Sequence, residues 1–127
     1  MDANSIKKLE QVDKRFIPLL EFVDKQLPIV VLCGHRNKIE QDAAFIKKAS
    51  KLQWPKSKHN SLPSLAVDIA PYPINWKNES DFYYLGGFVK ALAITMNIDI
   101  RWGGDWNRNH KPSDEKFRDL VHFEIIN

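Results

Sequence analysis

An aspartate stands in the middle of the short apolar run Ala66-Val67-Asp68-Ile69-Ala70. The run has the composition of a buried strand, and an ionised carboxylate in a protein core is costly unless it is paired or coordinates a metal ion. His59 precedes the run, in a polar stretch rich in turn-forming residues. Any fold of this chain must therefore bring a counter-charge or a cation to Asp68.

The spacing of apolar residues predicts an α+β fold. Helices are expected at residues 5–26 with a break near Pro18, at 39–52, and at 81–96 with Ser80 as N-cap. Strands are expected at residues 29–33, 65–70, 98–102 and 120–126. We expect a small, mainly antiparallel sheet with the helices packed on one side and the functional site in a cleft at the sheet.

Two of the expected helices carry more specific predictions. In the helix at 39–52, the spacing predicts inward positions for Ala43, Phe45, Ile46 and Ala49. In the helix at 81–96, Gly86-Gly87 weakens the helix locally, which is tolerable where another element must approach closely.

The bulk composition narrows the function classes. A chain of 127 residues suits one domain, and a formal charge of +3 spread along the chain permits an anionic partner without demanding one. No nucleic-acid motif is present and no apolar run is long enough to span a bilayer, so neither partner is expected. The single cysteine, Cys33, excludes an internal disulfide and fits a buried strand better than a catalytic thiol.

Polar residues also interrupt the strand at 120–126. Side chains alternate along a strand, so His122 and Glu124 share one face while Phe123 and Ile125 share the other. Taken alone, each polar residue fits an ordinary structural role. Two histidines and an aspartate together are the ligand set of a catalytic zinc site, in which a fourth position stays open. Spacing alone leaves open whether they meet.

The joint pattern resembles the VanY-type zinc peptidases, which have the hedgehog/D-Ala-D-Ala peptidase fold. It consists of Ser57-Lys58-His59, Ala66-Val67-Asp68 and Asp119-x-x-His122, supported by Gly34-His35-Arg36-Asn37 and Arg101-Trp102-Gly103-Gly104-Asp105-Trp106-Asn107. The family includes D-alanyl-D-alanine carboxypeptidases and phage endolysins that cut between L-alanine and D-glutamate in peptidoglycan. The gap from His59 to Asp68 is two residues longer than usual and holds Leu62-Pro63-Ser64 in place of the family's glycine. We interpret this as a subfamily variant.

The resemblance implies one Zn²⁺ bound by His59, Asp68 and His122. It also implies that Asp119 is the catalytic carboxylate and that Arg36 holds a substrate carbonyl or carboxylate. Three further residues are candidates for substrate binding or for orienting a ligand histidine: Ser57, Asp105 and Glu124. A turn-forming role is an open alternative for Ser57 and Asp105, and His110 is the alternative ligand to His122.

The implied function is a zinc-dependent peptidoglycan peptidase acting on the stem peptide, as an endolysin-like L-alanyl-D-glutamate endopeptidase. We expect a single peptidase domain at residues 1–127 without a separate wall-binding domain, and a monomer. No apolar signal core is present, so we expect synthesis in the host cytoplasm and action on the wall after release. The alternatives are a D,D-carboxypeptidase of the same fold and a non-catalytic module that binds wall peptides. Asp119 favours an enzyme over the binding module.

Overall fold

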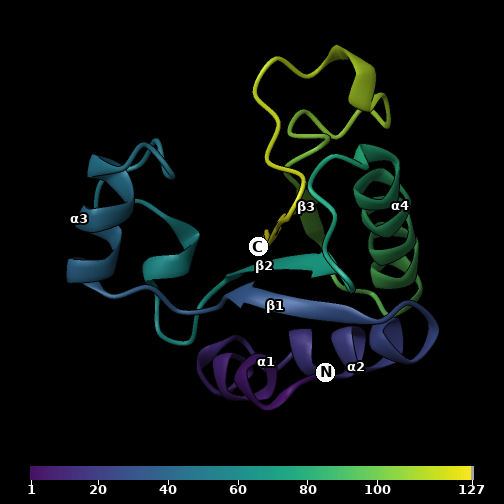
Figure 1. Ribbon diagram of the computed structural model, residues 1–127, viewed down its shortest axis with the longest axis horizontal. Helices are drawn as coiled ribbons and strands as arrows, with labels where there is room; N and C mark the ends of the chain where they lie inside the picture. Colours follow the sequence, from purple (N-terminus) through teal and green to yellow (C-terminus); the bar gives the residue numbers. More distant parts are fainter. Residues whose placement is uncertain (127) are drawn as a thin grey trace.

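A computed structural model describes residues 1–126 and shows an α+β fold built on a four-stranded antiparallel sheet (Figure 1). The strands are β1 (Ile29–Cys33), β2 (Ala66–Pro71), β3 (Ile100–Trp102) and β4 (His122–Ile125). The helices are α1 (Ala3–Lys8), α2 (Phe16–Gln26), α3 (Lys38–Ile46) and α4 (Glu79–Thr95), with short 3₁₀ turns at Leu9–Gln11, Lys58–Asn60 and Pro112–Asp114. The strand order is β1-β2-β4-β3. The expected α+β class and antiparallel sheet are confirmed, and Asn127, the last residue of the expected domain, lies outside the described residues.

The hydrophobic core lies between one face of the sheet and the helices α2 and α4, and the 3₁₀ turn after α1 adds Leu9 to it. The strands contribute side chains at alternate positions: Ile29, Val31, Val67, Ile69, Phe123 and Ile125. Burying each such side chain stabilises the fold by about 1.5–3 kcal/mol relative to leaving it in water. This face therefore holds the sheet and helices together, and the opposite face is left for polar side chains.

The N-terminal helical segment breaks as the proline pattern predicts. α1 ends at Lys8, and α2 begins at Phe16, so that Pro18 lies in the first turn of α2, where a missing N–H costs nothing. The predicted cap of α4 is wrong, because the helix begins after Asn78, and the Ser80 hydroxyl donates a hydrogen bond to the Asn78 side chain from inside the helix.

Gly86 explains how α4 approaches the sheet. A Cβ atom at this position would collide with the indole ring of Trp102 on β3, whereas a Cβ at Gly87 would meet nothing within 4 Å. Of the two glycines, only Gly86 is therefore needed for the close packing of α4 against β3.

The prediction for the helix at 39–52 is wrong in length and in its buried face. α3 ends at Ile46, and Lys48 has a positive φ of 62° that no helix continues through. Phe45 and Ile46 are exposed, as are Ala43 and Ala49, and the buried residue of α3 is Gln41. The spacing identified an apolar stripe, but α3 stands apart beyond the end of β1, where no other layer covers that stripe (Figure 1).

No helix among residues 1–126 is both long enough and apolar enough to cross a membrane.

Candidate functional site

A cleft of about 270 Å³ opens beside the end of β2 and β4, between the segment that follows α3 and the long loop that precedes β4. The sequence singles out eight candidate residues. Five of them come from distant segments of the chain and line this cleft together: Arg36, His59, Asp68, Asp119 and His122. Ser57 and Glu124 line it as well, and Asp105 does not. The structure thus brings seven of the eight candidate residues to one place.

The carboxylate of Asp68 lies at the centre of this group. Its Oδ1 atom is 3.1 Å from Nε2 of His59 and 3.1 Å from Nδ1 of His122. The pairing of β2 with β4 places Asp68 directly opposite His122, and the 3₁₀ turn at Lys58–Asn60 brings His59 to the same point. Both imidazoles are buried, with residue exposures of 2% and 8%. Two nitrogens and one oxygen therefore converge, which is a donor set that suits zinc.

The outward-facing nitrogen of each histidine has its own partner. Nδ1 of His59 lies 2.7 Å from the carbonyl oxygen of Gly34, which can only accept a hydrogen bond, so this nitrogen carries the proton. Nε2 of His122 lies 2.8 Å from a carboxylate oxygen of Glu124, and Arg101 donates to the other oxygen at 2.8 Å. These partners leave the inward nitrogens available as ligands, an arrangement common at metal-binding histidines.

The electrostatics of the group follow from this geometry. Burial favours the neutral form of Asp68, yet hydrogen bonds from His122 and His59 outweigh it and lower the pKa of Asp68. Burial likewise opposes charge on the two histidines, and the bonds to Asp68 outweigh it and raise the pKa of each. The site therefore attracts positive charge to Asp68, and a bound dication would replace protons on the imidazoles.

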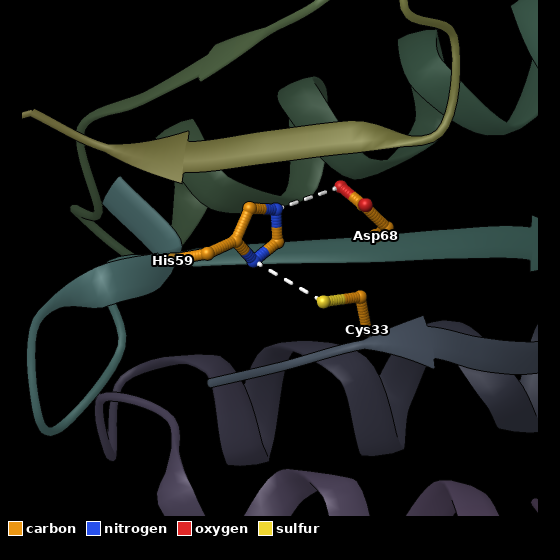
Figure 2. Close-up of side chains that lie close together, drawn as sticks. All are labelled: Cys33, His59 and Asp68. Atoms are coloured by element: carbon orange, nitrogen blue, oxygen red, sulfur yellow. Dashed lines mark hydrogen bonds and ion pairs between the residues drawn. The ribbon is translucent and has the colours of Figure 1, made fainter. Parts of the chain in front are cut away.

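Cys33 offers a second way to assemble three donors, with His59 and Asp68, since single donor atoms of these residues lie within 4.8 Å of one another. Figure 2 shows the His59 ring standing between the other two, with one nitrogen toward Asp68 and the other toward Cys33. The thiol sulfur lies 3.7 Å from Nδ1, the nitrogen already used by Gly34. The two possible sets share His59 and Asp68 and differ in the third donor, Cys33 or His122, so metal binding by variants at these two positions distinguishes them.

Asp119 is half-buried at the wall of the cleft, three residues before His122. Among the described residues its carboxylate accepts no hydrogen bond, although its backbone bonds Gly103 and His122. Burial first, and then the negative charge of Asp68, raise the pKa of Asp119. A carboxylate with a raised pKa and free oxygens is suited to accept and return a proton.

Arg36 and Ser57 also line the cleft. A guanidinium nitrogen of Arg36 lies 3.9 Å from Asp68, and another donates to the buried Gln41 at 2.9 Å. The Ser57 hydroxyl accepts a hydrogen bond from the backbone N–H of His59 at 3.2 Å, which caps the turn that carries this histidine. Ser57 thus has the turn-forming contact that was the open alternative for it.

Asp105 and His110 lie elsewhere. The Asp105 carboxylate is fully buried and accepts hydrogen bonds from Lys90 of α4 at 2.8 Å and from the backbone N–H of His110 at 3.0 Å. Among residues 1–126, Asp105 forms no hydrogen bond or ion pair with a candidate ligand histidine, and His110 approaches Lys90 rather than Asp68. Asp105 therefore fixes the loop, which was the alternative left open for it.

Two residues near His122, Arg101 and Trp106, belong to the segment that supports the resemblance, but neither was assigned a role at the site from the sequence. Arg101 pairs with Glu124 across β3 and β4, and its position between the apolar Ile100 and Trp102, on the other face of the strand, was a signal that could have found it. The Trp106 ring lies 5.4 Å from the His122 ring, centroid to centroid. No local pattern predicts that contact, because Trp106 belongs to an irregular loop.

The model of a family described as phage L-alanyl-D-glutamate peptidase matches residues 1–126. The structure is similar to the Serratia marcescens L-Ala D-Glu endopeptidase ChiX, with a TM-score of 0.76 and 21% sequence identity over 99% of this chain and 89% of that one. It is also similar to a mutant of the vancomycin-resistance D,D-pentapeptidase VanY from a VanB-type cassette in complex with Zn(II), with a TM-score of 0.60 and 16% identity over 91% and 73% of the two chains. No curated protein sequence matches the chain. Because the family model covers residues 1–126, the chain belongs to the phage L-alanyl-D-glutamate peptidase family, as its motifs predicted.

Proposed function

We propose that this peptidase hydrolyses the L-alanyl-D-glutamate bond of the wall stem peptide with one zinc ion held by His59, Asp68 and His122. The observation that carries the proposal is the convergence of Nε2 of His59, Oδ1 of Asp68 and Nδ1 of His122 in one cleft. Family membership supports the reaction, and the solved structure of similar fold in complex with Zn(II) supports the metal.

A zinc ion in this site would lower the pKa of a water molecule and polarise the scissile carbonyl. Asp119 would take the proton from the attacking water and return it to the leaving amine, since its carboxylate is free and its pKa is raised. Arg36 would orient the substrate carbonyl, with its guanidinium held at the cleft by Gln41. Glu124, held by Arg101, would keep the His122 ring in its ligating orientation.

We also propose, as the sequence led us to expect, that residues 1–127 form a single peptidase domain and that the enzyme is a monomer. The enzyme would be made in the host cytoplasm and would reach the stem peptide once the membrane is breached. The net charge of +3 suits approach to an anionic wall.

The test compares the wild type with Asp119→Asn on two synthetic peptides. One contains an L-alanyl-D-glutamate bond, and the other ends in D-alanyl-D-alanine; mass spectrometry identifies the bond that is cut. We expect cleavage of the first peptide, with about one zinc per chain. Asp119→Asn should keep the zinc and lower kcat by about 10²–10⁴-fold. The matched control, Asp42→Asn on the exposed face of α3, should change neither.

Three results would count against the proposal. Cleavage confined to the D-alanyl-D-alanine peptide would favour the D,D-carboxypeptidase alternative. Zinc binding and peptide binding without cleavage would favour the binding module. Full activity in Asp119→Asn would remove Asp119 from the reaction.

A further inference from the structure

The wall of the cleft carries more positive than negative side chains. Its cations are Arg36, Lys51, Lys56, Lys58 and Arg101, and its carboxylates are Asp68, Asp119 and Glu124. A cleft with an excess of one sign concentrates ligands of the other sign. The excess here favours a substrate that brings at least one carboxylate into the cleft.

The contacts within the cleft show which cations are already engaged. Arg36 lies beside Asp68, and Arg101 is paired with Glu124. The Lys58 ammonium donates to the backbone carbonyl of Ile125 at 3.4 Å. Within residues 1–126, neither Lys51 nor Lys56 forms an ion pair or a hydrogen bond through its ammonium group. These two lysines, which we call the lysine rim, are the uncommitted charges of the cleft.

Aromatic contacts tie the lysine rim to the proposed metal site. The Lys51 ammonium stands 4.0 Å above the Phe117 ring, and this ring stacks on Trp106 with centroids 6.2 Å apart. Trp106 in turn lies against His122. A cation over an aromatic ring is attracted by the electrons of the ring face and keeps its full charge. Lys51 is thus held across the cleft entrance while it stays available to an anion.

The substrate bond determines which carboxylate would meet the rim. In an L-alanyl-D-glutamate bond the glutamate supplies the amino group, and only one of its two carboxyl groups continues the peptide. The other is a free carboxylate within the residue that follows the scissile bond, unless it is amidated. The cleft volume of about 270 Å³ is below the usual range of about 300–1,000 Å³ for ligand pockets, so only residues next to the scissile bond fit inside.

We propose that Lys51 and Lys56 bind the free carboxylate of the D-glutamate residue and so make the enzyme selective for substrates in which that group is not amidated. This inference rests on the proposed function. It adds a specificity determinant outside the metal ligands and the catalytic carboxylate.

The test uses two synthetic stem peptides that differ only in the D-glutamate side group, as carboxylate or carboxamide. The wild type should show a kcat/KM about tenfold higher for the carboxylate peptide, a modest ratio because exposed charges are screened by water and salt. The double variant Lys51→Gln/Lys56→Gln should lose this preference, because its kcat/KM for the carboxylate peptide falls toward that for the amidated peptide. Lys47→Gln, an exposed lysine that does not line the cleft, should keep the preference.

Binding is measured beside cleavage, so that the two proposals can fail separately. The dissociation constants of both peptides are determined for zinc-loaded Asp119→Asn, with and without the two lysine substitutions. Tighter binding of the carboxylate peptide that depends on the lysines, without any cleavage by the wild type, would support the lysine rim and overturn the proposed reaction. Cleavage of both peptides with equal kcat/KM would disprove the proposed role of the lysine rim, whereas the proposed reaction would still hold. A third peptide carries the amide on the third residue of the stem instead. If the preference follows amidation at that residue, the proposed role of the lysine rim is overturned.

Discussion

Two aspartates of this chain, the half-buried Asp68 and the fully buried Asp105, have opposite environments. Oδ1 of Asp68 lies between two imidazoles that can also bind a metal, whereas the Asp105 carboxylate is held by the Lys90 ammonium and a backbone N–H. Both have a lowered pKa despite burial, because their partners outweigh it. A buried carboxylate alone therefore does not mark a metal site; the chemistry of its partners does.

The difference extends to what each aspartate holds in place. Asp68 is part of β2, so the sheet fixes its position opposite His122. Asp105 begins an irregular loop and connects it to α4 through Lys90. That loop carries Trp106 and Asp119 to the cleft. We therefore expect changes at Asp68 to affect metal binding, and changes at the Asp105 pair to affect stability.

Replacement of Asp68 should have the largest effect. In Asp68→Asn the central ligand loses its charge, so zinc should no longer raise the melting temperature as it does for the wild type. Loss of the metal removes several kcal/mol of transition-state stabilisation, so kcat/KM should fall by about 10³-fold or more. Calorimetry with added zinc and peptide cleavage check both expectations. A variant that still gains stability from zinc would show that Asp68 is not a ligand.

Replacement of Lys90 should have the next largest effect, on folding rather than on metal binding. Lys90→Met leaves the carboxylate of Asp105, whose side chain is 0% exposed, without its cation. Breaking a buried pair in this way costs about 3 kcal/mol. Urea denaturation should show this loss, with zinc stoichiometry unchanged. The matched control is Lys38→Met, which breaks an exposed pair with Asp42 and should cost at most about 0.5 kcal/mol. Equal losses of unfolding free energy in Lys90→Met and Lys38→Met would contradict a larger contribution from the buried pair.

Replacement of Glu124 should have the smallest of the three effects, a weaker affinity for the metal. Glu124→Gln keeps the shape of the side chain but removes the charge that orients His122 through a 2.8 Å contact. Loss of such a supporting carboxylate typically weakens metal binding about 10–100-fold. Competition with a zinc chelator would measure the change, and Glu21→Gln on the exposed side of α2 is the control. An unchanged affinity would show that the charge of Glu124 is not needed to orient the His122 ring.

The part of this site that could be predicted from sequence follows the periodicity of the strands. Alternation along β4 placed His122 and Glu124 on one face, and antiparallel pairing with β2 then brings Asp68 opposite His122. His59 lies in a turn without periodicity, so its place depended on the resemblance to a family. The same limit applies to the ion pair of Lys90 and Asp105, because nothing local relates a loop residue to a helix 15 positions earlier.

The error at α3 has a different cause. The spacing of Phe45 and Ile46 described a real apolar stripe, but spacing cannot say whether another layer exists to cover it. The buried Gln41 carries the specific contact of that helix, since it holds Arg36 beside the cleft. As with Asp68 on β2, the polar residue within the apolar pattern, here Gln41, indicated the functional site.

The central claim is that His122, and not Cys33, completes the metal site with His59 and Asp68. The most direct test is the zinc content of the purified wild type, His122→Ala and Cys33→Ala after dialysis against trace zinc. The account predicts about one zinc per chain in the wild type and in Cys33→Ala, and none in His122→Ala. Zinc retained in His122→Ala and lost in Cys33→Ala would contradict it and would assign the metal to the opposite side of the His59 ring.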